Sequence, residues 1–325
     1  MSHPYDRLTP DRILDAVEST GLLPSGQVLA LNSYENRVCQ VGIEDAEPVV
    51  AKFYRPGRWS DQAILEEHAF SAELAAAEIP VVAPLAFGGR TLLEHAGFRF
   101  ALFPRRGGRA PEPGDLDQLE WIGRFLGRIH RAGQARPFAH RPTLDLATYG
   151  HPARAAVLES PLLPADLQAP YAEVSEAVLA QVAQALEAVN PARLRLHGDC
   201  HPGNILWTEA GPHFVDMDDC LQGPAIQDLW MLLGGERREM TLQLDALLEG
   251  YRTFCDFDPR ELALIEPLRA LRLVHYSGWL CRRWDDPAFP RAFPWLAERS
   301  YWEDHLNDLR QQLLRMAEPP LASWP

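Results

Sequence analysis

The chain has 325 residues, a formal net charge of −14 and 46% hydrophobic residues. Such a length exceeds one small domain and suits two domains with sizeable cores. The negative charge disfavours general nucleic-acid binding, so we expect no nucleic-acid partner. No apolar run reaches the roughly 18 residues of a membrane span, so we also expect no membrane association. The five cysteines are scattered without a CxxC pair and the N-terminus is polar, which predicts reduced thiols and a cytoplasmic protein without a signal peptide.

Short stretches of apolar residues in the first third of the chain predict a small antiparallel sheet. Two helices are expected beside it, one over residues 8–20 with Thr9 as its cap, and one over residues 60–78 capped by Ser60. The first two strands should form a hairpin whose tip contains polar, turn-forming residues. The expected strands cover residues 27–31, 37–43, 49–53, 81–87, 91–93 and 98–103.

Pro, Gly and Arg dominate residues 105–114, which predicts a linker. The chain beyond it is mostly helical in pattern, with a strong helix over residues 172–189 and a tail over residues 317–325. The predicted fold class is therefore α+β and two-lobed. A small N-lobe over residues 1–104 would hold the antiparallel sheet, and a mainly helical C-lobe would cover residues 115–325.

One stretch interrupts the helical half with residues suited to chemistry. A loop carrying Asp199 and Asn204 leads into a short apolar strand, and a second apolar strand ends at Asp216. Carboxylate and amide oxygens suit Mg²⁺, and a carboxylate beside the metal can orient a hydroxyl nucleophile, as phosphoryl transfer requires. We therefore predict that Asp199 and Asp216 are catalytic. Asp199 would accept or orient the hydroxyl proton, while Asn204 and Asp216 would bind Mg²⁺.

Several neighbouring residues are open to two interpretations. His197 is expected to brace the loop rather than to bind a metal, and Cys200 has no role in Mg²⁺ chemistry, which disfavours a zinc site. Asp218 and Asp219 either assist a second metal or cap the following turn. Asp228 either hydrogen-bonds back to the catalytic loop or is a first-turn acid favoured by the helix dipole.

Of the 31 basic residues only one is lysine, Lys52. Arginine is a planar fork and lysine a compact point charge, so this lysine indicates a tight phosphate contact beside a carboxylate. Its strand, Val-Ala-Lys-Phe at residues 50–53, resembles the kinase strand whose lysine pairs with ATP phosphates and with a helix glutamate. We choose Glu67 for that glutamate because it shares a helix face with core residues, with Glu66 as the alternative. Ser33, at the hairpin tip, is a further candidate for phosphate contact.

These motifs resemble the aminoglycoside phosphotransferase and choline kinase branch of the protein kinase-like superfamily. The loop from His197 to Leu206 is similar to the catalytic loop of that branch, and Asp216 stands where its metal-binding aspartate stands. Within the branch, the chain is similar to bacterial stress-response Ser/Thr protein kinases, in register from about Gln27 to Leu233. That similarity is carried by Asn32-Ser33-Tyr34-Glu35-Asn36-Arg37-Val38, Lys52-Phe53-Tyr54-Arg55-Pro56, Ile64-Leu65-Glu66-Glu67-His68, Phe100-Ala101-Leu102-Phe103-Pro104 and Gly223 to Trp230.

The resemblance implies a two-lobed kinase fold that uses ATP and Mg²⁺, autophosphorylates, phosphorylates serine and threonine in proteins and supports survival under stress. The sequence departs from the broad kinase pattern in three places. Residues 32–36 stand in place of a Gly-x-Gly-x-x-Gly loop, Gly198 replaces the arginine of His-Arg-Asp, and Met217-Asp218 replaces Phe-Gly after the metal-binding aspartate. These departures indicate different phosphate contacts and no phospho-activated loop of the eukaryotic type.

The leading hypothesis is an ATP-dependent Ser/Thr protein kinase whose partners are protein substrates and which acts as a monomer. The alternative is a small-molecule kinase of the aminoglycoside, choline or homoserine type. An acidic substrate pocket would favour that alternative, and Asp218, Asp219 or the pair Asp285 and Asp286 would supply its acids. A third hypothesis is a nucleotide-binding pseudokinase that scaffolds a partner, although the intact catalytic residues argue against it.

Overall fold

The computed structural model describes residues 5–323 and divides into two compact units. The first unit comprises the chain up to Glu112 together with Phe138–Arg141 and His201–Cys220. The second comprises Pro113–Pro137, Pro142–Cys200 and the chain from Leu221 onward. Neither unit is a continuous stretch, whereas the two lobes expected from the sequence were each continuous. Residues 1–4 of the expected N-lobe and 324–325 of the expected tail lie outside the described part.

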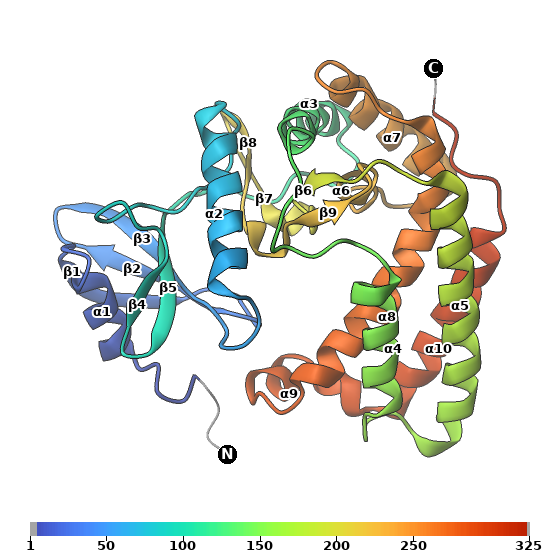
Figure 1. Cartoon of the computed structure of the whole chain (residues 1–325), viewed down its shortest axis with the longest axis horizontal. Helices are drawn as coiled ribbons and strands as arrows, with labels where there is room; N and C mark the ends of the chain where they lie inside the picture. Colours follow the sequence, from blue (N-terminus) through green and yellow to red (C-terminus); the bar gives the residue numbers. More distant parts are fainter. Residues whose placement is uncertain (1–4, 324–325) are drawn as a thin grey trace. The chain divides into compact units, whose positions relative to one another are not determined.

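A five-stranded antiparallel sheet forms the centre of the first unit (Figure 1). Its strands follow the order β1-β2-β3-β5-β4, so each strand of the β1–β2–β3 meander pairs with the next along the chain. The predicted antiparallel sheet in this part of the chain is confirmed. The strands are β1 (Pro24–Ala30), β2 (Arg37–Ile43), β3 (Ala46–Phe53), β4 (Leu93–His95) and β5 (Phe98–Pro104).

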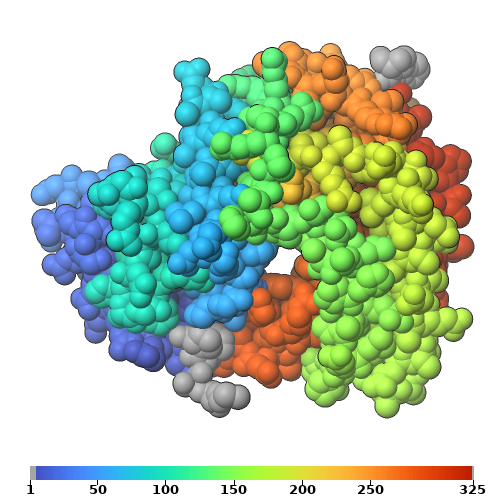
Figure 2. Space-filling view, in the orientation of Figure 1, coloured from blue at the N-terminus to red at the C-terminus, as the bar shows by residue number. Residues whose placement is uncertain are grey.

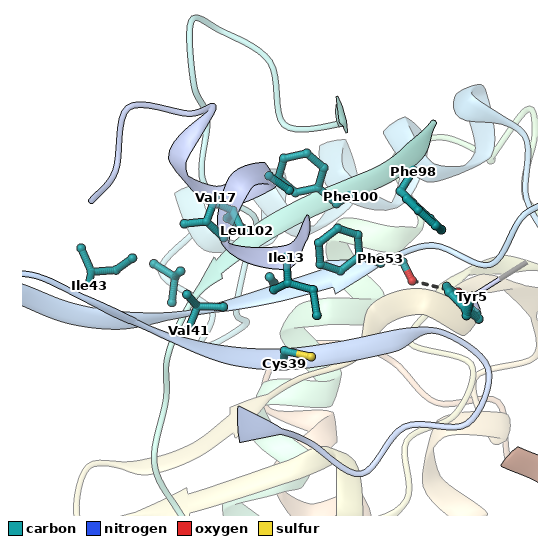
Figure 3. Close-up of a cluster of buried hydrophobic side chains, with 13 residues drawn as sticks. Tyr5, Ile13, Val17, Cys39, Val41, Ile43, Phe53, Phe98, Phe100 and Leu102 are labelled. Atoms are coloured by element: carbon teal, nitrogen blue, oxygen red, sulfur yellow. Dashed lines mark hydrogen bonds between the residues drawn. The ribbon is translucent and has the colours of Figure 1, made fainter. Parts of the chain in front are cut away.

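One face of this sheet carries the first hydrophobic core, which helix α1 (Pro10–Glu18) covers. Ile13 and Val17 of α1 lie against every second residue of the strands, as the alternation of a β-strand requires (Figure 3). Tyr5 donates a hydrogen bond from its hydroxyl to the carbonyl of Phe53 at 3.0 Å, which ties the segment before α1 to β3. The strand residues of this core include Cys39, Val41, Ile43, Val49, Ala51, Phe53, Phe98, Phe100 and Leu102.

The other face of the sheet packs against helix α2 (Asp61–Ala76). The Ser60 hydroxyl accepts a hydrogen bond from the N–H of Ala63 at 3.1 Å and so caps the first turn. Ile64 is fully buried with Tyr54 and Ala101 of the sheet. Because strand residues alternate between faces, the even-numbered residues at the end of β3 point toward α2.

A second β-hairpin completes the first unit. Strands β7 (Ile205–Thr208) and β8 (Gly211–Phe214) lie between short 3-10 turns at Pro202–Asn204 and Met217–Asp219. Phe214 exchanges backbone hydrogen bonds with Pro80 and Val82, and Arg109 does so with Trp207. These bonds explain why the hairpin folds with the first unit.

The prediction of a strand over residues 81–87 is wrong. That segment makes isolated bridges at Val81 and Phe87 and one backbone hydrogen bond to β5, from the N–H of Leu85 to the carbonyl of Leu102 at 2.7 Å, but it forms no ladder with the five-stranded sheet. Pro80 and Pro84 lack the N–H groups that a ladder needs, so the apolar run between them cannot pair continuously.

The second unit is mainly helical, which confirms the predicted character of this part of the chain. Gly123 and Gly127 let α3 approach the backbone of α7, because a Cβ on Gly123 would lie 2.1 Å from the carbonyl oxygen of Leu247. Helices α4 and α5 lie side by side, in green and yellow-green in Figure 2. The helices are α3 (Leu116–Gly133), α4 (His151–Leu158), α5 (Gln168–Val189), α6 (Gln227–Trp230), α7 (Arg237–Arg252), α8 (Ile265–Arg283), α9 (Ala288–Ala292) and α10 (Arg299–Met316), with short helical turns at Leu146–Gly150, Ala165–Leu167, Pro259–Leu264 and Pro294–Ala297.

A two-stranded ladder that the sequence did not suggest also belongs to this unit. Strand β6 (Leu194–Leu196) pairs antiparallel with β9 (Leu221–Gly223). The ladder fixes the main chain immediately before the loop that carries Asp199. Across residues 5–323, no helix combines the length and the apolar character needed to cross a membrane.

Candidate active site

Lys52 lies on β3 opposite Ala101, with its side chain on the face of the sheet that α2 covers. Its Nζ is 3.0 Å from Asp216 Oδ1, 3.1 Å from Asp218 Oδ1 and 3.9 Å from Glu67 Oε1. Burial alone would lower the pKa of Lys52, but the three carboxylates raise it well above its usual value. The first unit therefore holds a buried ammonium group whose charged form the three carboxylates stabilise.

The two adjacent glutamates of α2 point in different directions. Glu67 is 2% exposed and faces Lys52, and burial raises the pKa of its carboxyl although Lys52 acts in the opposite sense. Glu66 instead accepts hydrogen bonds from the backbone N–H groups of residues 139–141, at 2.6, 2.7 and 3.0 Å. Arg141 in turn donates to the main-chain carbonyl of Asp218. Of the two candidates, the structure brings Glu67 to the lysine.

Asn204 and Asp216 lie at the same end of the β7–β8 hairpin. Asn204 precedes β7 and Asp216 follows β8, and the N–H of Val215 donates to the carbonyl of Asn204 at 3.0 Å. Asp216 has φ 58°, a left-handed conformation that aspartate tolerates better than most residues, and its side chain is 56% exposed.

The donor atoms at this hairpin end suit a hard divalent cation. Carboxylate and amide oxygens are ligands that Mg²⁺ accepts, usually together with water and substrate phosphates. Within residues 5–323, no group of three or more His, Cys, Asp or Glu side chains is arranged to hold a metal. Asn204 and Asp216 offer one amide and one carboxylate side chain of this kind at the same end of the hairpin.

Asp218 has a role that neither interpretation of the sequence anticipated. It is 2% exposed, forms ion pairs with Lys52 and Arg58, and accepts a hydrogen bond from Asn36 Nδ2 at 3.0 Å. Arg58 also pairs with Asp219 at 2.5 Å. Although burial alone would raise the pKa of Asp218, the neighbouring cations hold it well below its usual range. Asp218 thus links the tip of the β1–β2 hairpin to the loop after β8, through contacts between residues more than 150 positions apart.

Ser33 braces the tip of that hairpin. Its hydroxyl oxygen accepts from the N–H of Val38 at 3.1 Å, and its O–H donates to the carbonyl of Leu31 at 3.4 Å. Asn36, a few residues on, accepts from the N–H of Arg55 at 3.1 Å. These bonds hold the turn that stands in place of a glycine-rich loop, and the hydroxyl of Ser33 takes part in the turn itself.

In the second unit, helix α6 clamps the loop that carries Asp199. Asp228 is fully buried, and its two carboxylate oxygens accept from the N–H groups of His197 and Gly198, each at 2.8 Å. Gln227 donates through Nε2 to the carbonyl of Gly198 at 2.9 Å. Of the two interpretations of Asp228, the structure therefore supports the hydrogen bonds to the loop.

The clamp, formed by Asp228 and Gln227 on the backbone of residues 197–198, also involves α3. His130 is fully buried and its Nε2 lies 3.0 Å from Asp228 Oδ2, so this oxygen receives two hydrogen bonds. A carboxylate can only accept, which means that His130 donates through Nε2. Nothing in the sequence near residue 130 indicated this contact, because it joins residues 98 positions apart.

The two residues directly after Asp199 are a buried cysteine and a histidine that caps the next turn. Cys200 is fully buried, and burial raises the pKa of its thiol well above the usual value, which opposes the thiolate that zinc would need. His201 accepts from the N–H of Gly203 through Nδ1 at 3.0 Å and caps the turn at Pro202–Asn204. The chain passes between these two residues from the second unit to the first.

Arg272 of α8, which sequence reasoning overlooked, contacts a predicted catalytic residue. Its Nη1 donates to Asp199 Oδ1 at 2.7 Å. The pair joins residues 73 positions apart, and no local motif around residue 272 signals it.

Comparison with known proteins identifies the relatives of the chain. Residues 27–265 match the phosphotransferase enzyme family. The chain is 47% identical to the serine/threonine protein kinase RdoA of Salmonella typhimurium over 321 residues, which cover 99% of this chain and 97% of that protein. It is 48% identical to stress response kinase A of Escherichia coli K12, with the same coverage.

A solved structure shares the fold. Amicoumacin kinase hAmiN, in complex with AMP-PNP, Ca²⁺ and Ami, superposes with a TM-score of 0.73 at 18% sequence identity, over 97% of this chain and 96% of that one. At this identity the likeness concerns the fold alone. The predicted relationship to the aminoglycoside phosphotransferase branch and the predicted fold class are both confirmed.

Proposed function

Because the chain belongs to the phosphotransferase enzyme family, and is therefore a kinase, we propose that it transfers the γ-phosphate of ATP to serine and threonine hydroxyls of proteins. The relatives named as a Ser/Thr protein kinase and as stress response kinase A support this acceptor class. The observation that carries the proposal is the buried Lys52, held among three carboxylates of which Asp216 is open to solvent.

Each proposed role follows from the chemistry of the group. Lys52, oriented by Glu67, contacts the α- and β-phosphates of ATP. Asn204 and Asp216 hold Mg²⁺, which when bound neutralises charge on the phosphates. Asp199 accepts or orients the proton of the acceptor hydroxyl.

The remaining expectations are part of the same proposal. The N-lobe extends over residues 1–104, the linker over residues 105–114 and the helical C-lobe over residues 115–325. Ser33 contributes a phosphate contact through the turn that it braces. The protein acts in the cytoplasm as a monomer on protein substrates.

The alternative acceptor, an amine-bearing small molecule, would need unpaired carboxylates, since a cation is held by opposite charge. Asp218 and Asp219 are ion-paired with Arg58. Asp286 is 3% exposed and accepts from the N–H of Ala288 at 3.0 Å, so it serves a turn. Of the four acids considered for such a pocket, three already have structural partners, which favours the protein acceptor.

The test is incubation with labelled ATP and Mg²⁺, with either a generic protein such as myelin basic protein or a small alcohol such as choline. Wild type is compared with Asp199→Ala and with a control, Asp258→Ala, which alters an exposed surface ion pair of the same unit. Label on protein that disappears only in Asp199→Ala supports the proposal. Consumption of ATP only with the alcohol supports the small-molecule kinase, and nucleotide binding without any turnover supports the pseudokinase.

A further inference from the structure

The loop that carries Asp199 is held from two sides. Its main chain is fixed by Asp228 and Gln227 of α6, which bind the backbone of His197 and Gly198. The Asp199 side chain is held separately, by Arg272 of α8. The Nη1–Oδ1 distance of 2.7 Å is that of a charge-assisted hydrogen bond.

Helix α8 is a rigid support for this arginine. Gly278 packs against α4 so closely that a Cβ would lie 2.5 Å from the Cα of Ala153. From α10, Gln312 donates through Nε2 to the main-chain carbonyl of Glu266 at 3.0 Å. With its backbone fixed at these two points, α8 presents the guanidinium of Arg272 at a defined position.

We propose that Arg272 is a positioning residue for phosphoryl transfer, acting through Asp199. This inference rests on the proposed role of Asp199 as the residue that receives the acceptor hydroxyl. The guanidinium restricts the rotamers of the carboxylate, and a hydroxyl is then oriented along one direction rather than several. Its positive charge also offsets the repulsion that any carboxylate close to an attacking oxygen exerts on the phosphoryl group.

The ion pair between Arg272 and Asp199 is too exposed to contribute much to the stability of the fold. The side chains of Arg272 and Asp199 are 43% and 24% exposed, and ion pairs open to water contribute little to folding. A structural role would therefore leave both the melting temperature and the turnover of an Arg272 variant near wild type. A positioning role lowers turnover alone.

The first experiment compares Arg272→Ala and Arg272→Lys with wild type and with a matched control, Arg282→Ala. Arg282 lies on the same helix and donates to the carbonyl of Pro152 at an exposed site. We expect Arg272→Ala to lower kcat by about tenfold to a hundredfold, with little change in the KM for ATP or in Tm. Arg272→Lys should recover part of the loss because it keeps the charge but not the planar fork. Millimolar guanidinium should partly rescue Arg272→Ala and leave Arg282→Ala unchanged.

The second experiment is a double-mutant cycle with Asp199→Ala. If Arg272 acts through Asp199, adding Arg272→Ala to Asp199→Ala causes no further loss of kcat. Multiplied losses would overturn the inference, because Arg272 would then act independently of Asp199. Wild-type turnover in Arg272→Ala would overturn it too, and a rise in turnover would identify the contact as an inhibitory latch instead.

Hydrolysis of ATP, with water as the acceptor, is measured beside protein labelling in every variant. If the wild type hydrolyses ATP but labels no protein, the proposed acceptor is wrong, while the hydrolysis ratio of Arg272→Ala to wild type still tests the arginine. If the wild type labels protein and Arg272→Ala labels it equally fast, the inference alone fails.

Discussion

Replacement of Asp228 by asparagine perturbs the catalytic loop at a fully buried point. The two carboxylate oxygens of Asp228 serve three donors: the N–H groups of His197 and Gly198, each at 2.8 Å, and His130 Nε2 at 3.0 Å. Asparagine keeps only one acceptor oxygen. In its best orientation this oxygen stays with His197 and His130, so that the amide NH₂ group opposes the N–H of Gly198.

The cost follows from this geometry. One buried N–H loses its partner, which costs about 1–3 kcal/mol, and the other two bonds lose the assistance of a charged acceptor. We expect the free energy of unfolding to fall by about 3 kcal/mol. Because Asp199 follows Gly198 directly, displacement of this loop should also lower kcat by about a hundredfold.

Urea denaturation gives the free energy of unfolding, and steady-state phosphoryl transfer below the melting transition gives kcat. Asp258→Asn is the matched control, since it makes the same change at a partly exposed residue of the same unit. An Asp228→Asn protein with wild-type stability and turnover would refute the clamp. A loss of stability without a loss of kcat would mean that the clamp does not position Asp199.

Three further outcomes are expected. Lys52→Arg should fold normally yet lose about a hundredfold in kcat/KM, because a larger, planar cation replaces a point charge among three carboxylates; full activity would contradict the role given to the single lysine. Burial raises the pKa of Glu261 to about 7 from 4.5, so the stability from its protonated form is present below about pH 4.5 and is lost as the pH rises through about 7. Glu261→Gln keeps an acceptor for the N–H of Ile226 but has no carboxyl group that ionises. The Tm of this variant minus that of the wild type should therefore increase between about pH 5 and pH 8; a constant difference would contradict this. Glu66→Gln should lower the free energy of unfolding in urea by about 1 kcal/mol, because one amide oxygen replaces two carboxylate oxygens beneath the N–H groups of residues 139–141; an unchanged value would argue against this contact.

The parts of the site that follow local periodicity were predictable from the sequence. Alternation along β3 places Lys52 on the face opposite the α1 core, and the apolar stripe of α2 selects Glu67 over Glu66 for that face. The hairpin that brings Asn204 and Asp216 to one end was readable from two short apolar runs and a turn. In each case the pattern of polar and apolar residues within one short segment predicts where the side chain lies.

The parts that depend on contacts distant in sequence were not predictable. The partners of Asp218 at Asn36 and Arg58 come from turns whose approach no pattern encodes. The same holds for Arg272, whose contact with Asp199 depends on the packing of α8. The strand expected over residues 81–87 does not form for a different reason: the residues there are largely apolar, but Pro80 and Pro84 lack the N–H groups that continuous pairing needs.

Transfer of phosphate to a serine or threonine hydroxyl is tested most directly by locating the phosphorylated atom. Wild type and Asp199→Ala are incubated with ATP, Mg²⁺ and a protein acceptor, and the phosphorylated residues are identified by mass spectrometry. We predict phosphoserine or phosphothreonine with the wild type and neither with the variant. Equal phosphorylation by the two proteins, or phosphate recovered only on a small alcohol, would contradict the proposed reaction.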